Sequence, residues 1–259
     1  MDLGLDGKVA VVTGASKGIG LAIAQGFVRE GARVVAGARS RSAELDDLAA
    51  AGGVEVVPVD LAEPAGPARL VAAAGDRIDV LVNNVGLAVP RPEGFLEVTD
   101  EMWQASITLN LMAAVRATRA AMPVMLAAGG GLIVNTGSLN ARLPDPLVVD
   151  YSAAKAALVN LAKSLSKEFG PRGIRVATVD PGPVATDLWL GADGVAQRVG
   201  KASGQAPEEV AAAAARGMLT GRFTRPEEVA DLVLLLASDR VANVTGADFV
   251  IDGGMIPTL

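Results

Sequence analysis

The chain has 259 residues, carries a formal net charge of −6 and contains neither cysteine nor histidine. Without these residues it can form no disulfide, no thiol nucleophile, no Ser-His-Asp triad and hardly any zinc site, so no metal site is expected. Hydrophobic residues make up 51% and charged residues 20%, which suits a large core and argues against disorder. There is no basic run and no membrane-length apolar run, so nucleic acid and membranes are not expected partners. The N-terminal stretch does not resemble a signal peptide, and we expect a cytoplasmic protein.

Short β-branched runs alternate with alanine-rich stretches along the whole chain. The runs are apolar at consecutive positions, as in strands buried on both faces of a parallel sheet. They lie at 8–12, 33–36, 54–59, 80–83, 132–136, 175–179 and 248–251. Helices are expected near 18–30, 41–51, 65–75, 100–128, 151–169 and 226–237. This order predicts a single α/β domain over 1–259, a doubly wound parallel sheet of about seven strands with helices on both faces.

The first run leads directly into TGASKGIG, residues 13–20, and then into an apolar helical pattern. One glycine allows a tight turn, the next lets the backbone approach a pyrophosphate, and the third lets the helix pack close to the sheet. The helix N-terminus would face the phosphate charge. We expect a Rossmann-type dinucleotide site, with an ordinary glycine turn as the weaker alternative. The expected contacts in this loop are Gly14, Ser16, Lys17, Gly18, Ile19 and Gly20.

The only tyrosine of the chain lies in YSAAK, residues 151–155. Lys155 follows Tyr151 by about one helical turn, so both side chains project from one face. A phenol ordinarily titrates near pKa ~10. We expect the charge of Lys155, together with that of an oxidised cofactor in the dinucleotide site, to lower the pKa of Tyr151. Considered alone, Lys155 could equally be a solvated surface residue.

Together these two motifs resemble those of the short-chain dehydrogenase/reductase family. The resemblance extends over nearly the whole chain, in the family's order: NNVG at 83–86, TLN ending at Asn110, NTGS ending at Ser138, PGPVATD at 181–187 and DGG at 252–254. Val85 departs from the family's usual alanine. The resemblance implies a hydride transfer between a nicotinamide cofactor and a carbonyl or secondary alcohol.

The resemblance also assigns roles to four residues. Tyr151 would exchange a proton with the substrate oxygen, and Ser138 would hydrogen-bond that oxygen. Lys155 would hold the nicotinamide ribose, and Asn110 would hold a water that relays protons to the lysine. Singly, Ser138 could be a helix cap and Asn110 a polar group of a helix interior. Their joint spacing favours catalysis.

The end of the second run distinguishes the two nicotinamide cofactors. An acid there binds a free ribose 2′-OH, whereas a basic group accommodates a 2′-phosphate. Ala38 and Arg39, with Lys17 as a second cation, favour NADP(H) over NAD(H), although Arg39 could also be a solvated charge. By resemblance, further cofactor contacts come from Asp60, Leu61, Asn84, Gly86, Tyr151, Lys155, Pro181, Gly182, Val184 and Thr186.

The resemblance is specific about three of these contacts. Asp60 would read the adenine amino group, Thr186 would hydrogen-bond the nicotinamide carboxamide, and Val184 would pack against the ring. The segment 187–225 that follows is longer than an ordinary connection, and we expect it to be a substrate lid. Its apolar residues could form a wall over the nicotinamide or anchor the lid to the core: Leu188, Trp189, Leu190, Met218, Leu219 and Phe223.

We expect a carbonyl substrate with an apolar portion, facing Leu139, Asn140 and Leu143. By resemblance, 3-oxoacyl thioester reduction is the most familiar activity. However, AAGGG before residue 132 lacks the basic residues of reductases that act on an acyl carrier protein, although Arg172 and Arg175 follow. A ketone, aldehyde, sugar or quinone therefore stays open.

Two alternatives and the assembly state complete the expectations. An NAD-dependent alcohol, sugar or steroid-type dehydrogenase is the second hypothesis. A non-catalytic nucleotide-binding protein is disfavoured because all four catalytic candidates are present. By resemblance, helices 100–128 and 151–169 would pair in a homotetramer, and a dimer is also compatible.

Overall fold

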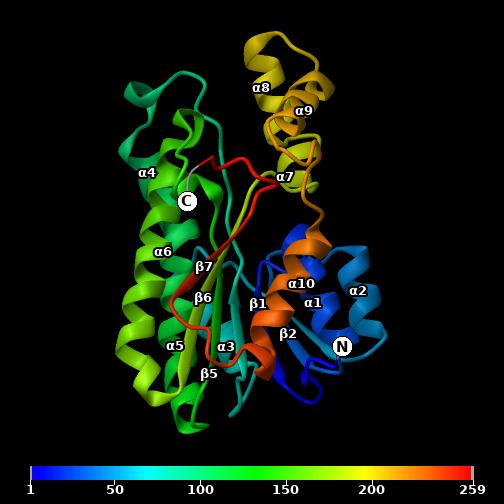
Figure 1. Ribbon diagram of the computed structural model, residues 1–259, viewed down its shortest axis with the longest axis vertical. Coiled ribbons are helices and arrows are strands. Elements are labelled where there is room, and N and C mark those ends of the chain that lie inside the picture. The colour runs from blue at the N-terminus through cyan, green and yellow to red at the C-terminus, as the bar shows by residue number, and fades with distance from the viewer. Residues whose placement is uncertain (1, 258–259) are drawn as a thin grey trace.

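The computed structural model describes residues 2–257. Its seven strands form one parallel sheet in the order β3-β2-β1-β4-β5-β6-β7 (Figure 1). The strands are β1 (Val9–Thr13), β2 (Arg33–Ala38), β3 (Val54–Pro58), β4 (Val80–Asn83), β5 (Gly131–Thr136), β6 (Ile174–Pro181) and β7 (Ala247–Ile251). The predicted Rossmann-type doubly wound sheet is thus confirmed.

The strand order reverses beside β1. From there β2 and β3 extend the sheet in one direction, and β4 to β7 extend it in the other. Every residue of β1 and of β4 is buried, which explains why both strands are apolar up to their last residues, Thr13 and Asn83. In open α/β sheets a crevice forms at the carboxyl ends of the strands where the order reverses, and ligands bind there.

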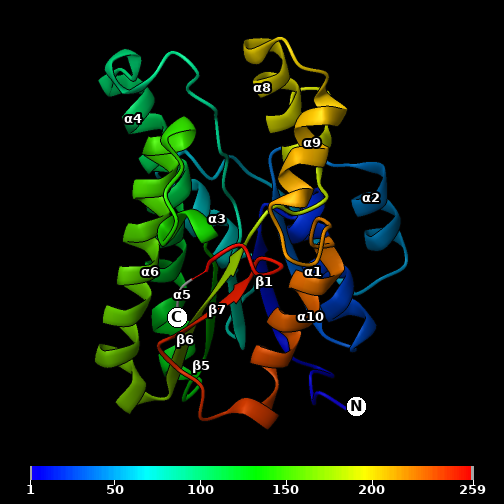
Figure 2. The ribbon, with the colours of Figure 1, turned by 45° about the horizontal axis from the view of Figure 1, so that its top comes forward.

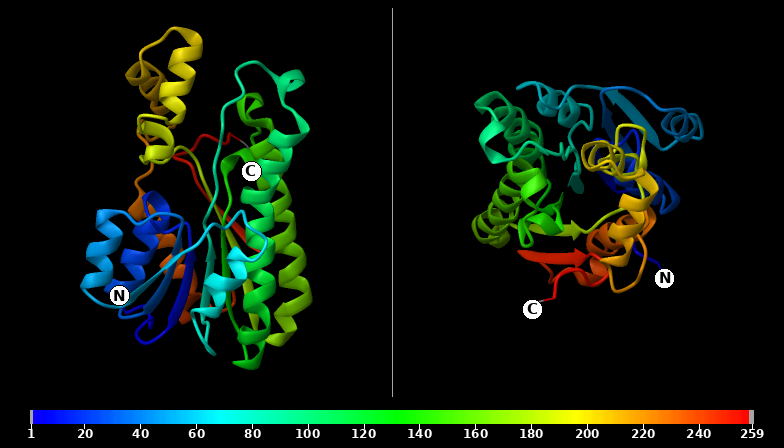
Figure 3. Two further views of the ribbon diagram at one scale, coloured as in Figure 1. Left: turned by 180° about the vertical axis from the view of Figure 1, so that it is seen from behind. Right: turned by 90° about the horizontal axis from the view of Figure 1, so that it is seen from above.

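Helices cover both faces of the sheet. The helices are α1 (Gly18–Arg29), α2 (Ala43–Ala50), α3 (Gly66–Ala72), α4 (Asp100–Ile107), α5 (Ala113–Ala127), α6 (Val149–Phe169) and α10 (Pro226–Ala237). On one face, Phe27 of α1, Leu45 of α2 and Leu234 of α10 share a core. On the other, Leu70 of α3 and Met125 of α5 share a second core with residues of α6. Figure 3 shows the two layers from behind and from above.

The helix expected over 100–128 is interrupted. A π-helical segment, Thr108–Met112, separates α4 from α5. A π turn holds an extra residue, which shifts the helix faces on either side of it. Asn110 lies at the centre of this segment and is buried.

The segment 187–225 is helical rather than a long loop. It forms α7 (Asp187–Leu190), α8 (Val195–Ser203) and α9 (Pro207–Arg216). These helices extend beyond the sheet on the same side as α4 (Figure 2). α7 is too short to leave a periodic signal, whereas the alanine run 211–215 favours the helix that α9 forms without marking a buried face.

Short turns complete the chain: η1 (Phe95–Glu97), η3 (Leu139–Ala141), η4 (Pro146–Val148), η5 (Gly170–Arg172) and η6 (Asp239–Val241). Among the residues that the structure describes, no helix combines the length and apolar character needed to cross a bilayer.

Candidate active site

The glycine loop joins β1 to α1 at the crevice. Gly14 and Gly18 have φ of +68° and +56°, a region that favours glycine. A Cβ on Gly20 would overlap the carbonyl oxygen of Gly14, so the helix start packs directly on the loop. Since α1 begins at Gly18, its unpaired N–H groups lie at the loop. This arrangement fits a pyrophosphate.

Asn84, which follows β4, holds the glycine loop. Its Nδ2 donates to the carbonyl oxygens of Thr13 at 3.0 Å and Gly14 at 3.1 Å. The hydroxyl of Thr13 accepts from the backbone N–H groups of Asn84 and Val85. The side-chain amide of Asn84, an expected cofactor contact, therefore fixes the glycine loop.

The end of β2 carries the expected basic residue. Ala38 is buried and Arg39 is exposed. Lys17 forms an ion pair of 3.3 Å with Asp187, the first residue of α7, and both side chains are about two-thirds exposed. Ser42 donates to the Ser16 carbonyl at 2.6 Å, which ties the glycine loop to the chain that follows β2.

Asp60 and Leu61 follow β3. Asp60 Oδ1 accepts a 2.8 Å bond from the backbone of Ala62, so this carboxylate shapes its own turn. Leu61 is buried in the second core. Both residues follow the carboxyl end of β3, which is where the adenine pocket of a dinucleotide site is expected.

Lys155 of α6 is buried, with 2% of its surface exposed. Its Nζ donates a 2.6 Å hydrogen bond to the carbonyl oxygen of Thr136 at the end of β5. It lies 5.6 Å from the centre of the Tyr151 ring, which bears out the shared helix face. Burial lowers the pKa of Lys155 to about 8, and the negative charge of Asp180 opposes this shift.

Tyr151 and Ser138 are brought together at the same end of β5. Burial raises the pKa of the Tyr151 phenol, a hydrogen bond with Ser138 lowers it, and the charge of Asp180 raises it. In the protein itself the pKa of this phenol is raised, because desolvation is the largest influence on it. The expected lowering, which included the charge of an oxidised nicotinamide, stays a prediction. Ser138 also accepts a 3.2 Å bond from the N–H of Asn140, so it caps η3 as well as contacting the tyrosine.

Asn110 lies beside Lys155 across Gly86. A Cβ on Gly86 would lie 2.9 Å from Asn110 Oδ1 and 3.3 Å from Lys155 Nζ. Asn110 exchanges two hydrogen bonds with the backbone of Leu87, of 2.8 and 3.1 Å. It also lines a hollow of about 730 Å³ between α4 and the chain after β4. The side chain expected to hold a relay water thus reaches both the lysine and a hollow open to solvent.

Residues 181–186 lead from the end of β6 to α7 and pass beside the glycine loop. A Cβ on Gly182 would lie 2.9 Å from Cα of Asp252, so the DGG segment packs against this turn. Val184 is buried and pairs with Thr224. The Thr186 methyl group would lie 3.1 Å from a Cβ on Gly18. The expected nicotinamide contacts Pro181, Gly182, Val184 and Thr186 therefore run along the crevice toward the phosphate loop.

Residues 14–256 match a family model described as enoyl-(acyl carrier protein) reductase. The chain belongs to the short-chain dehydrogenase/reductase family.

Curated members of this family are similar over their full length. The chain is 39% identical to D-threitol dehydrogenase of Mycolicibacterium smegmatis, covering 98% of this chain and 94% of the relative. It is 38% identical to L-xylulose reductase of Bos taurus over 100% of both chains. It is 34% identical to a 3-oxoacyl-[acyl-carrier-protein] reductase of Thermotoga maritima, covering 97% of this chain and 99% of the relative.

A solved structure of the family is also close. L-sorbose reductase from Gluconobacter frateurii, complexed with NADPH and L-sorbose, superimposes with a TM-score of 0.90, at 37% identity and with both chains covered completely. The predicted enzyme class, a dehydrogenase/reductase of CH–OH and C=O groups, is confirmed. Short-chain dehydrogenases/reductases use NAD(P), so the predicted nicotinamide cofactor is confirmed as well.

The apolar residues of the 187–225 segment are divided between two environments. Trp189 and Phe223 pack edge to face, with ring centres 5.4 Å apart, and Met218 is buried. Leu190 and Leu219 are exposed, by 50% and 88%. The aromatic pair therefore stabilises the segment itself, and only part of the expected wall is free to face a ligand.

Two charged groups beside the site were not anticipated from the sequence. Asp150, one residue before Tyr151, is 1% exposed and pairs with Arg91 at 2.7 Å. Its other oxygen accepts from the N–H of Tyr151 at 3.0 Å, so the pair fixes the first turn of α6. The second group is Asp180, at the end of β6. The sequence signal that could have identified Asp180 is an acidic residue within an otherwise apolar strand.

Proposed function

We propose that the protein is an NADP(H)-dependent reductase that interconverts a small ketose and its polyol. The observation that carries the proposal is the meeting of Tyr151, Ser138 and Lys155 at the strand edge that also holds the glycine loop. A proton donor, an oxygen-binding hydroxyl and a buried cation next to a dinucleotide cradle suit carbonyl reduction.

The crevice suits the 2′-phosphorylated cofactor. The glycine loop would hold the pyrophosphate, Arg39 and Lys17 the 2′-phosphate, and residues 181–186 the nicotinamide end. Ala38 supports this choice because no acid stands there to bind a free 2′-OH. When bound, NADPH supplies the hydride.

The protein's own groups supply the proton. Burial keeps the Tyr151 phenol protonated at neutral pH, which suits donation to a carbonyl oxygen in the reductive direction. Ser138 would donate its hydroxyl proton to the same oxygen and stabilise the charge that develops there. Lys155 and Asn110 would restore the proton from the solvent-open hollow beside Asn110.

The ketose assignment rests on the relatives. Three of those compared are named for threitol, xylulose and sorbose, which are polyols or ketoses. Polar side chains next to Ser138 agree with such a substrate, because they can hydrogen-bond hydroxyl groups. They include Asn140 and Ser152, with Asn140 Nδ2 3.5 Å from the Ser152 hydroxyl. We therefore replace the apolar substrate expected from the sequence by a polyhydroxylated one, and infer that the 187–225 segment covers it.

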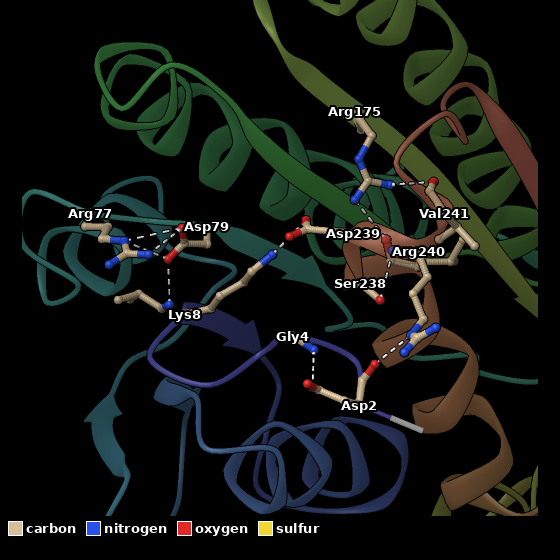
Figure 4. A network of polar contacts seen from close by, with 12 residues as sticks. Asp2, Gly4, Lys8, Arg77, Asp79, Arg175, Ser238, Asp239, Arg240 and Val241 are labelled. Atoms are coloured by element: carbon tan, nitrogen blue, oxygen red, sulfur yellow. Dashed lines mark hydrogen bonds and ion pairs between the residues drawn. The ribbon is translucent and has the colours of Figure 1, made fainter.

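The acyl carrier alternative is weaker. Arg175, at the opposite end of the sheet, donates to the carbonyl oxygens of Leu236, Val241 and Val244. Figure 4 shows its contact with Val241. Arg172 stacks on Phe169, 5.7 Å from its ring centre. Arg172 and Arg175 thus make contacts within the fold, and they add little to the binding of an acidic carrier protein.

The proposal is tested by following NADPH absorbance with a panel of carbonyl substrates: erythrulose, L-xylulose, L-sorbose, acetoacetyl thioester and crotonyl thioester. We expect turnover of at least one ketose and a loss of about 10²–10⁴-fold in Tyr151→Phe, with NADPH binding unchanged. Turnover of acetoacetyl thioester alone would favour 3-oxoacyl reduction, and of crotonyl thioester alone enoyl reduction. A preference for NADH would favour the NAD-dependent alternative.

We further infer that the protein assembles through α5 and α6. An apolar hollow of about 630 Å³ lies between these helices. It is lined by Val115, Met122, Pro123, Leu126, Leu161, Leu165 and Phe169, with Arg119 and Arg172 beside them. A second copy would cover this surface, in a tetramer or a dimer. The cytoplasmic location stays a prediction.

A further inference from the structure

Asp180 is a fully buried acid beside the catalytic residues. It lies at the end of β6 with 0% of its surface exposed. Side chains alternate along a strand, so Asp180 shares the sheet face of Val176, which packs in the core that includes Ala162 of α6. An isolated carboxylate is costly to bury unless other groups compensate it. Its contacts therefore indicate what it does.

One carboxylate oxygen holds the backbone of Ser138. Asp180 Oδ1 accepts a 3.0 Å hydrogen bond from the N–H of Ser138. This approach requires glycine at the preceding position, because a Cβ on Gly137 would overlap the same oxygen. Since Ser138 lies close enough to the Tyr151 phenol to lower its pKa, a fixed Ser138 backbone also fixes the hydroxyl proposed to meet the substrate oxygen.

The other oxygen has no hydrogen-bond partner. Asp180 Oδ2 is buried and faces the guanidinium of Arg142, whose Nε lies 3.6 Å away. Arg142 is 42% exposed and also binds Asp248 of β7 at 2.8 Å. The arginine is therefore shared between two acids, and the charge of the buried one is only partly neutralised.

The uncompensated charge acts on the catalytic pair. Asp180 raises the pKa of both Tyr151 and Lys155. Burial raises the pKa of Asp180 itself to about 6, with Asp248 adding to the shift and Arg142 and Lys155 opposing it. The carboxylate is thus charged above about pH 6, and Lys155 holds its proton below about pH 8.

We propose that Asp180 is a positioning residue of the proton-transfer site: it fixes Ser138 and keeps the ammonium of Lys155 charged, while Arg142 moderates its field. The role in turnover rests on the carbonyl reduction proposed above. The electrostatic role belongs to the protein alone, and it can be measured without any substrate.

The test uses the single tyrosine of the chain. With one tyrosine, the ultraviolet absorbance of tyrosinate after a pH jump reports Tyr151 only. Asp180→Asn keeps the size of the side chain and an oxygen for the Ser138 N–H, but removes the charge. We expect tyrosinate to form about half a pH unit or more below the wild type. The alkaline limb of kcat/KM should move in the same direction, with the NADPH dissociation constant unchanged.

Arg142→Gln gives the opposite change at a partly exposed position. Removing the positive charge should move tyrosinate formation to higher pH. Asp248→Asn is the matched control: it removes a carboxylate from the same arginine but none from Ser138, and its shift should be less than half of that in Asp180→Asn. Circular dichroism on the same samples reports folding.

Two results would overturn the proposal. One is a folded Asp180→Asn protein that titrates like the wild type, because a merely structural acid would change the melting temperature and leave the phenol alone. If Asp180→Asn does not fold, the second result is an Arg142→Gln protein whose tyrosine titrates at the same pH as in the wild type. If none of the ketoses is turned over, the titration still decides the role of Asp180.

Discussion

Lys17 of the glycine loop and Asp187 at the start of α7 form an ion pair of 3.3 Å across the crevice. The lysine proposed to bind the 2′-phosphate is thus shared with the segment proposed to cover the substrate. We predict that Asp187→Asn frees Lys17 and tightens NADPH binding by about two- to fivefold, since exposed pairs contribute less than about 1 kcal/mol. Fluorescence titration measures it, and weaker binding would show that the aspartate has another role.

Arg39 should distinguish the two cofactors. We predict that Arg39→Ala weakens NADPH binding by about tenfold and leaves NADH binding unchanged, because only NADPH carries a 2′-phosphate. Arg41→Ala is the control, since Arg41 is engaged with Asp46. Equal losses for both cofactors would contradict a phosphate-binding role.

Lys155 should lower the free energy of unfolding as well as act in the proposed catalysis. Its folded pKa of about 8 lies below its ordinary value, so the buried ammonium destabilises the fold below pH 8. Between that pH and the ordinary lysine pKa the unfolded chain binds more protons, so stability rises with pH. We predict that Lys155→Met abolishes turnover and raises the free energy of unfolding by about 1–2 kcal/mol at neutral pH, after the lost bond to Thr136. Urea unfolding should show this gain shrinking above pH 8.

Gly86 should be irreplaceable for a steric reason. A methyl group there would meet both Asn110 Oδ1 and Lys155 Nζ. We predict that Gly86→Ala lowers kcat by about 10–100-fold, because small displacements at a catalytic site are costly. Gly170→Ala, where a Cβ meets nothing within 4 Å, is the control and should retain wild-type rates. Comparable losses in both variants would point to a general effect on folding.

The apolar hollow between α5 and α6 should set the assembly state. We predict that Leu161→Glu, which puts a charge on this surface, yields a smaller species in analytical ultracentrifugation. If a second copy covers this surface, burial of an unpaired carboxylate at the interface costs free energy and weakens the association. An unchanged sedimentation coefficient would place the interface elsewhere.

The strands and the glycine loop could be predicted because their signals are local. Continuous apolar runs specify buried parallel strands, and TGASKGIG specifies a turn that only glycine permits. In the 187–225 segment the alanine run 211–215 favours a helix, as α9 confirms, but it fixes no buried face, and α7 is too short to leave a periodic signal.

The candidate catalytic residues could be proposed from motif spacing, but their electrostatics could not. The direction of the Tyr151 pKa depends on burial and on Asp180, which lies 29 residues away along the chain and reaches the site only through the register of β6 beside β5. The Arg91–Asp150 pair likewise joins segments distant in sequence. Contacts of this kind follow from tertiary packing rather than from local pattern.

The π-helical segment at Thr108–Met112 has a consequence for how this site tolerates length changes. A π turn amounts to one extra residue in an α-helix, so a single deletion there would restore the ordinary pitch and relieve the helix. It would also rotate Asn110 away from Gly86 and Lys155. The place of Asn110 in the proposed proton relay is in this sense encoded as a one-residue insertion, and a lineage that lost the insertion would gain a more regular helix and lose that placement.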